Sequence, residues 1–490
     1  MFIFISYSNT LFSYASSGKK INYSQKTEKN LANNEKIENK TLIINFKNLK
    51  TLLLNNNKEL IKYKSQVSQA KASLKSKKST WYPKLNISSN SLPSLTTGEI
   101  DNKLSTDSAT NQLKYELNGS ITWNIIEPSR KLEINIAEDS LKNSEYQYAF
   151  IKNELFLKAA KLYFSIQRSI QDIKTTQQAI EISKTSLKEA KNRYESGIGN
   201  KLDLLEAKTQ LGREKIALVK INGKLRFNKN ELAKILNLKE NYIIETEEVP
   251  RILGFWHLNK KDSLSEGFKN RYDLKIAAKE IDINAKKAKS IISGKKPKLT
   301  LYNNYSISTS KGETSVSEPN FDNVINTNNN TLGIKFNLDL YDGGLIKQEF
   351  KRIMERQNEL VADLQLKKLE IETSIINALS DLKISKENII ISYQQVKSAK
   401  ESLNISMKRL DAGLTTQREI VNLQGDVTEA ESNYINAITE YNTSIETLIR
   451  STGIRNYNSC HISSKEDIFV NFAKKNELLN CNLTEHEMNI

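Results

Sequence analysis

The chain has 490 residues, 38% hydrophobic and 8% aromatic, and its 73 Lys and Arg against 57 Asp and Glu give a formal net charge of +16. The apolar residues lie in stripes, and no run approaches the roughly 18 to 20 apolar residues of a transmembrane helix. The lysines are spread over polar helix faces without a nucleic-acid-binding motif, so we expect a solvated surface and no nucleic-acid partner. With three histidines and no phosphate-binding loop, nucleophile elbow or metal-binding His pair, we expect no enzyme, no cofactor and no metal site.

The first segment, residues 1–15, is apolar and aromatic and ends in Ser13-Tyr14-Ala15. This composition predicts a secretory signal peptide with its cleavage site. A basic N-terminal region is missing, so a buried segment or a misplaced start codon stays an alternative. Residues 16–40 are rich in Lys, Asn and Glu without periodicity, and we expect a flexible leader there.

Residues 41–238 are predicted to form a first structural repeat, in which a helix precedes strands at 84–91 and 114–125. Apolar and polar residues alternate strictly along the second of these strands. Alternation of that length is typical of transmembrane β-barrels, whereas a strand half-buried on a soluble core, the alternative, is usually shorter. The polar segment 89–113 is predicted to be a long exposed loop. The side chains expected to face lipid are Tyr115, Leu117, Ile121 and Trp123.

A long helical hairpin completes this repeat. Apolar residues recur at every seventh position from Ile166 to Tyr194 and again from Leu204 to Leu232, which is the pattern of helices packed as coiled coils. The glycine turn near Gly197 separates the two seams. The sequence therefore predicts an antiparallel hairpin with its tip at that turn.

After a linker at 239–262, residues 263–453 are predicted to repeat the whole arrangement. The motif Arg-Tyr-Glu-Ser-Gly that ends at Gly197 returns as Arg-Leu-Asp-Ala-Gly ending at Gly413, 216 residues later, and marks a second hairpin tip. A self-similarity of this kind is the signature of a tandem duplication.

The second repeat has its own predicted strands, at 298–307 and 331–341, with an exposed polar loop at 308–330 between them. Their lipid-facing side chains are expected to be Leu332, Ile334, Phe336 and Leu338. The polar C-terminal tail, 454–490, carries Cys460 and Cys481, which could form a disulfide or remain free.

The predicted fold class is mainly α with transmembrane β. Duplicated long antiparallel helical hairpins form an α-barrel, and each protomer contributes four strands to a shared, trimeric β-barrel. Two strands per repeat are too few for an independently stable sheet, so several chains are expected to pool their strands.

These features together resemble the TolC-type outer-membrane efflux proteins. The resemblance covers about residues 41–453 and rests on the order of the elements, their duplication, the two glycine tips, Trp123-Asn124-Ile125-Ile126-Glu127-Pro128-Ser129-Arg130 and Tyr341-Asp342-Gly343-Gly344. It implies a homotrimer in the lipid of the cell outer membrane, with helices extending into the periplasm. It also implies a passive exit duct for efflux or type I secretion, which docks with a periplasmic adaptor and an inner-membrane pump.

The resemblance further implies a cation-sensitive constriction just beyond the tips, where rings of carboxylates face the lumen. The corresponding positions are Asp203, Glu206, Glu419 and Asn422. This chain departs from the familiar pattern, because Glu419 replaces an Asp, Asn422 is neutral, and Leu410 and Thr415 stand where a Tyr and an Arg take part in gating. The alternative is that these carboxylates are solvated or cap the helix starts.

The tips are the expected adaptor-docking surface, because their glycines permit tight turns and leave the backbone exposed. The residues concerned are Tyr194, Gly197, Gly199, Leu410, Gly413 and Leu414. The alternative function is a soluble, basic coiled-coil scaffold that binds nucleic acid or a membrane surface.

Overall fold

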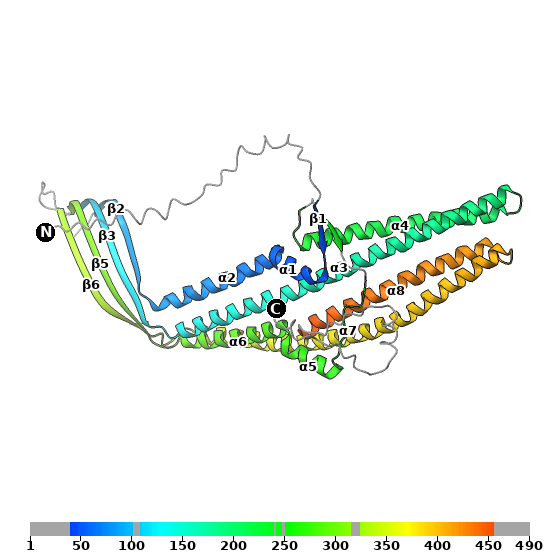
Figure 1. Cartoon of the computed structure of the whole chain (residues 1–490). Coiled ribbons are helices and arrows are strands. Elements are labelled where there is room, and N and C mark those ends of the chain that lie inside the picture. The colour runs from blue at the N-terminus through cyan, green and yellow to red at the C-terminus, as the bar shows by residue number, and fades with distance from the viewer. Residues whose placement is uncertain (1–39, 101–107, 240–241, 247–249, 315–323, 455–490) are drawn as a thin grey trace, which may run out of the picture.

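The computed structural model describes residues 40–100, 108–239, 242–246, 250–314 and 324–454. The predicted signal peptide, the leader up to residue 39 and the tail from residue 455, with both cysteines, lie outside the described residues. Long helices run side by side from a four-stranded sheet at one end of the molecule to two hairpin turns at the other (Figure 1).

The two halves of the chain have the same order of long elements, as the duplication predicts. The first half consists of α1 (Phe46–Asn56), α2 (Lys58–Lys78), a 3-10 turn (Ser79–Trp81), β2 (Lys84–Ile100), β3 (Ser108–Ile126), α3 (Arg130–Glu195) and α4 (Lys201–Ile235). The second consists of α5 (Lys260–Asn270), α6 (Tyr272–Ser293), β5 (Lys298–Thr314), β6 (Val324–Asn337), α7 (Leu345–Asp411) and α8 (Gln417–Thr452). At about 1.5 Å per residue, α3 and α7 each span roughly 100 Å.

Each half also contains a helix break that the periodicity did not predict. Asn57 has extended backbone (φ −67°, ψ 123°) and caps α2 by accepting from the Leu60 amide. Its side-chain amide donates to the Ile235 carbonyl at 2.7 Å, which holds the break against the end of α4. The equivalent break in the second half is at Arg271, whose buried guanidinium pairs with Asp273.

The four long strands form one antiparallel sheet in the order β2-β3-β5-β6. The strands are longer than predicted, because most of the polar segments 89–113 and 308–330 pair within the sheet instead of forming loops. In a Ser- and Asn-rich strand, the backbone N–H and C=O groups form hydrogen bonds with the neighbouring strand. The composition of the strand alone does not show that such a neighbour exists. Pro93 is tolerated because it lies at a register shift of β2, between Ser91 and Ser94, where the regular pairing with β3 is interrupted. At the other end, β6 stops at Asn337, so Leu338 lies just beyond it.

A second sheet was missed entirely by the sequence prediction. β1 (Lys40–Ile44) pairs in parallel with β4 (Tyr242–Thr246), joining the start of the predicted first repeat to the predicted linker. Ile44 and Ile244 of this pair are buried in a core with α1, α3 and the end of α4. Phe46 stacks on Phe164 there with 5.3 Å between ring centroids.

Residues 251–254 of the predicted linker pack against α8. Ile252 is buried among the α7 and α8 side chains, the Tyr441 hydroxyl donates to the Gly254 carbonyl, and the Asn442 amide donates to the Arg251 carbonyl at 2.8 Å. The connection between the halves is therefore part of the packed body.

Candidate functional site

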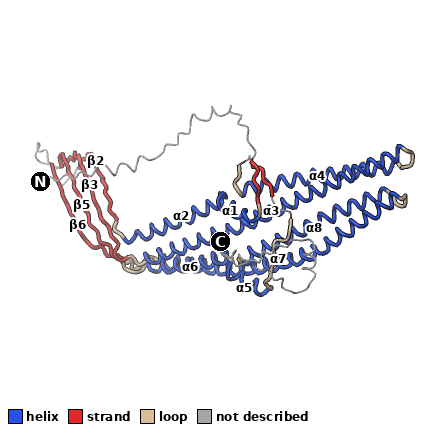
Figure 2. Tube along the Cα trace, viewed as in Figure 1, coloured by secondary structure: helices blue, strands red, loops and turns tan. Residues whose placement is uncertain are grey.

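The two hairpin turns lie at the same end of the molecule, opposite the sheet (Figure 2). Both use the same helix ending: the amide of Ile198 donates to Arg193 O at 3.0 Å, and that of Leu414 donates to Arg409 O at 2.8 Å. This bond closes a Schellman-type turn around a left-handed residue. Gly197 and Gly413 occupy that position with φ of 75° and 72°.

Gly199 is needed for a different reason, which is close packing. A Cβ at this position would lie 2.8 Å from the backbone carbon of Arg193, nearer than real contacts allow. Thr415 stands at the aligned position of the second tip, so the first turn is the tighter of the two.

The tips differ from the predicted docking surface at two positions. Leu410 is only 7% exposed, so it packs inside its hairpin and does not lie on the surface as expected. Ile198, which the sequence analysis missed, is 85% exposed and corresponds to Leu414, which is 69% exposed. Ile198 could have been identified from the sequence, because the 216-residue offset between the repeats aligns it with Leu414, which was predicted to lie on the docking surface. Tyr194 is also exposed, as expected.

The predicted constriction residues lie within the first two turns of α4 and α8. Asp203 lies in the first turn of α4, and Asn422 is exposed on α8. Glu206 forms an ion pair with Arg418 (3.8 Å), so the starts of α4 and α8 lie side by side. Arg418 was not predicted, and it places a positive charge beside one of the proposed carboxylates.

Glu419 has hydrogen-bond partners within its own hairpin. Its carboxylate accepts from the Thr415 hydroxyl and, at 3.1 Å, from the Ser406 hydroxyl. These two hydrogen bonds lower the pKa of Glu419 and keep it charged. Its amide is capped by Thr416. The Glu419 carboxylate thus links the first turn of α8 to the preceding turn and to α7, while the cap of α8 is Thr416.

At the opposite end, the sheet has one apolar and one polar face. Directly paired residues share a face, and Leu117 pairs with Ile307, while Leu301 pairs with both Trp123 and Ile334. The opposite face carries pairs such as Ser120 with Asn304. The predicted lipid-facing side chains are exposed in the single chain: Tyr115, Leu117, Ile121, Trp123, Leu332, Ile334, Phe336 and Leu338.

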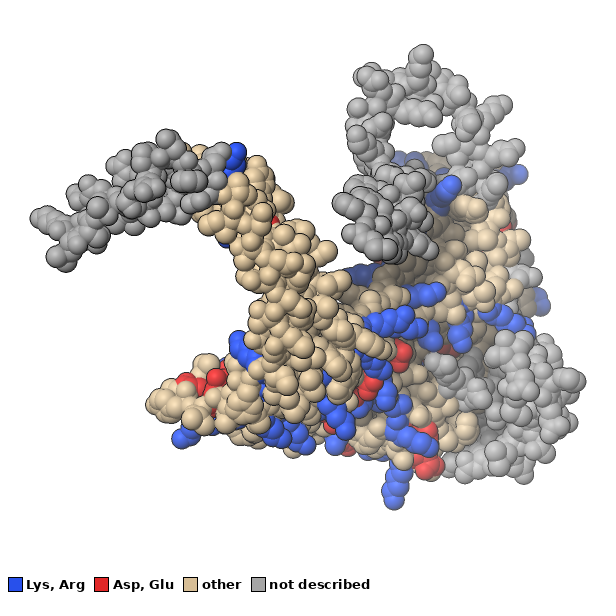
Figure 3. Space-filling view, turned by 90° about the vertical axis from the view of Figure 1, so that its left-hand side faces the viewer, with Lys and Arg blue, Asp and Glu red and all other residues tan. Residues whose placement is uncertain are grey.

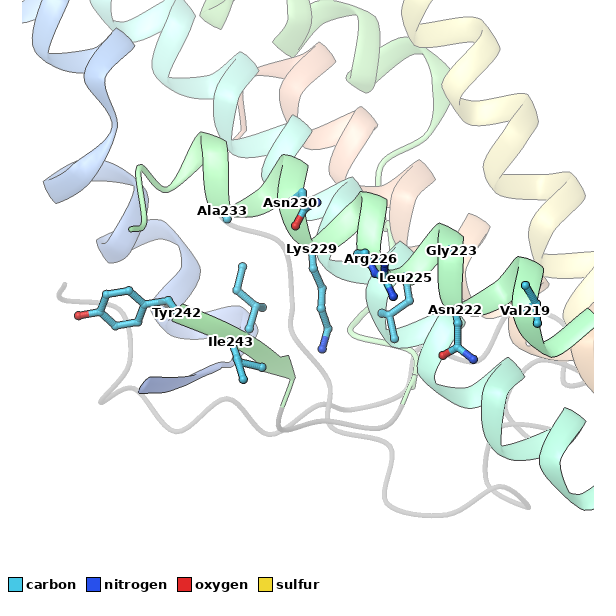
Figure 4. Close-up of a pocket in the computed structure, with 11 residues that line it drawn as sticks. Val219, Asn222, Gly223, Leu225, Arg226, Lys229, Asn230, Ala233, Tyr242 and Ile243 are labelled. Carbon is cyan, nitrogen blue, oxygen red and sulfur yellow. The ribbon is translucent and has the colours of Figure 1, made fainter. Parts of the chain in front are cut away.

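A groove of about 740 Å³ lies away from both ends, between α4 and β4. Figure 4 shows Lys229 reaching from α4 toward Ile243 of β4. Among the described residues, its lining combines apolar side chains with Arg226, Lys229 and Tyr242.

Within the described residues, no helix is both long and apolar enough to span a bilayer. The family model for outer membrane efflux proteins matches residues 49–238 and 264–454. This match covers most of both repeats, and the chain belongs to the outer membrane efflux protein family.

Individual relatives agree with this assignment. The chain is 23% identical to outer membrane protein TolC of Vibrio cholerae over 341 residues, which is 66% of this chain and 73% of that protein. It is 28% identical to the fusaric acid resistance protein FusA of Burkholderia cepacia over 104 residues, only 21% of this chain and 19% of that protein. The CmeC outer membrane channel of Campylobacter jejuni has the same fold, with a TM-score of 0.72 at 16% identity over 83% of this chain and 85% of that one.

Proposed function

We propose that this chain is the passive exit duct of a tripartite efflux or type I secretion system and works as a homotrimer. The observation that carries the proposal is the open four-stranded sheet with one apolar face, continuous with helices about 100 Å long. The edge strands β2 and β6 each have a partner on one side only. Pairing β6 of one copy with β2 of the next would close a barrel and remove both edges.

In this arrangement the barrel lies in the outer membrane and the helices extend into the periplasm. Both tips then lie at the periplasmic end, where an adaptor and an inner-membrane pump would dock. The exposed Ile198 and Leu414 and the exposed backbone at Gly197 and Gly413 support this role, because they offer apolar contact and close approach at the extreme end. Tyr194 and Gly199 belong to the same surface.

We assign Asp203, Glu206, Glu419 and Asn422 to the constriction of the duct. Three-fold symmetry would turn each carboxylate into a ring, which favours cations and binds multivalent ones. The Glu206–Arg418 pair would reduce the field from one ring, and the lowered pKa of Glu419 would keep another charged.

The test is single-channel conductance of the purified trimer in planar bilayers. The triple variant Asp203→Asn, Glu206→Gln, Glu419→Gln should lose most of its cation selectivity and weaken its block by trivalent cations by at least tenfold. The matched control neutralises exposed acids on helices away from the tips: Glu59, Glu145 and Asp381. Unchanged selectivity and block in the triple variant would refute the constriction, and absence of any channel from the wild type would refute the duct.

A further inference from the structure

Lysines gather where the sheet meets the helices. The segments 71–84 and 284–298, which lead into β2 and β5, contain eleven Lys and no Asp or Glu. Seen from the sheet end, Lys and Arg side chains are frequent on the helices around the base of the sheet, with fewer Asp and Glu among them, whereas the sheet itself shows few charges (Figure 3). Lysines of two segments that are far apart in the sequence therefore lie around the base of one sheet and form a basic collar.

The duplication identifies four collar positions that occur in both halves. Lys75 corresponds to Lys289 at an offset of 214, and Lys131 corresponds to Lys347 at an offset of 216. All four side chains are exposed, and none forms a salt bridge within the described residues. The neighbouring Lys77 and Lys78, in contrast, pair with Glu133 and Glu138. We call Lys75, Lys131, Lys289 and Lys347 the collar lysines.

Helix electrostatics do not explain these positions. Lysine is stabilised in the last turn of a helix and destabilised in the first. Lys131 and Lys347 lie in the first turns of α3 and α7, and the last turn of α6 contains no basic residue, so Lys289 precedes it. Only Lys75 lies where the helix dipole favours it. The four exposed charges are therefore free to interact with water or with an anion from outside the chain.

The level of the collar corresponds to a membrane–water boundary. Trp81 and Tyr82 are exposed between the end of α2 and β2, and Trp123 of the apolar face donates its indole N–H to the Trp81 carbonyl at 2.9 Å. Aromatic side chains form girdles at the interfaces of membrane barrels. Lys75 lies less than two helical turns before Trp81, within about one Debye length of headgroups at that level.

We propose that the collar lysines bind the phosphodiester headgroups of anionic phospholipids in the leaflet next to the helices. This inference rests on the proposed placement of the sheet in the outer membrane. The lysine side chain carries a point charge on a flexible stem, so the ammonium group can reach the headgroup layer while the stem lies along apolar surface. Such a flexible charge suits mobile lipid headgroups better than a rigid site with fixed bidentate geometry does. In a trimer the four collar lysines of each protomer would repeat around the barrel and hold a ring of anionic lipid at its base.

The test reconstitutes the wild-type trimer into phosphatidylcholine vesicles that contain spin-labelled phosphatidylglycerol or spin-labelled phosphatidylcholine. The fraction of label immobilised on the protein is compared between the two lipids. We expect a severalfold preference for phosphatidylglycerol that disappears in 0.5 M salt and in the variant with all four collar lysines changed to Gln. The variant with four Lys→Arg changes should retain the preference.

The matched control changes four exposed lysines of the distal helices to Gln: Lys188, Lys208, Lys397 and Lys408. It removes the same charge and should keep the lipid preference. An equal loss in the control would overturn the collar in favour of a net-charge effect. The proposal would also be overturned if the inserted, conducting wild type showed no preference for phosphatidylglycerol over phosphatidylcholine. It would likewise be overturned if the wild type instead bound purified peptidoglycan through the same lysines. A wild type that enters no vesicle would refute the proposed function itself.

Discussion

At the scale of single residues, Glu446 is a carboxylic acid buried in the middle of the packed body. It lies on α8 and is only 4% exposed. Burial raises its pKa to about 7, and the positive charge of Lys50 opposes the shift. A folded-state pKa above the unfolded value means that the folded protein binds the proton more tightly. Stability should therefore be greatest below the unfolded pKa, near 4.5, and should fall as the pH rises toward 7.

The variant Glu446→Gln keeps the shape of the protonated side chain and removes this pH dependence. We expect it to be more stable than wild type by ~1–3 kcal/mol at pH 8 and nearly equal to it at pH 4.5. The measurement is urea denaturation of the detergent-solubilised protein at both pH values. Glu440→Gln, at an exposed position of the same helix, is the control and should change little. The prediction would be contradicted if the free energy of unfolding depended on pH in the same way in the wild type and in the Glu446→Gln variant.

At the scale of elements, the hairpin turns depend on the left-handed backbone of Gly197 and Gly413. A residue with a Cβ costs roughly 1–2 kcal/mol in that conformation, which is small against the packing of two long helices. We therefore expect Gly197→Val combined with Gly413→Val to reshape the tips and abolish export while the trimer still forms. Export of a toxic dye from cells and the trimer band on a gel provide the two readouts.

The control for the tips is Gly212→Val, at a glycine inside α4 that has open space around it and no positive φ. It should leave both export and the trimer unchanged. If the tip variant lost the trimer as well as export, the turns would be structural only, and the docking role would be refuted.

At the scale of the whole molecule, the two faces of the sheet should respond oppositely to charge. Ile334 lies on the apolar face and is 63% exposed in the single chain, whereas Thr331 lies on the polar face opposite Asn304. An Arg side chain that faces lipid near the middle of the bilayer destabilises the barrel by about 2–4 kcal/mol, whereas an Arg that faces the lumen stays hydrated. Ile334→Arg should therefore reduce the amount of heat-resistant trimer in the outer membrane, and Thr331→Arg should not. Equal effects at both positions would contradict the assigned faces.

Features with a regular period could be predicted from the sequence, because period reports which face of an element is buried. The long helices, the alternation in β3 and β6 and the glycine turns at 197 and 413 are of this kind. Features that depend on a distant partner could not. The polar ends of β2 and β5 look like loops until their neighbours are known, and the five-residue strands β1 and β4 are joined only by pairing across 200 residues of chain.

The same limit applied to the candidate site. The tips were found from their repeated motif, but the burial of Leu410, the ion pair between Glu206 and Arg418 and the hydroxyl partners of Glu419 depend on how neighbouring helices pack. Spacing along one helix cannot report which side chain of another helix it meets.

By itself the sequence determined that this protein is a duplicated pair of long helical hairpins with two amphipathic strands in each half, because heptads, alternation and glycine turns are local patterns that repeat. The tertiary structure alone decided the register that gives the sheet one apolar face, the parallel pair that joins the start of the first repeat to the linker, and the collar formed by lysines from four separate segments. Burial and electrostatic potential depend on which segments come together in space, and only the folded chain specifies that.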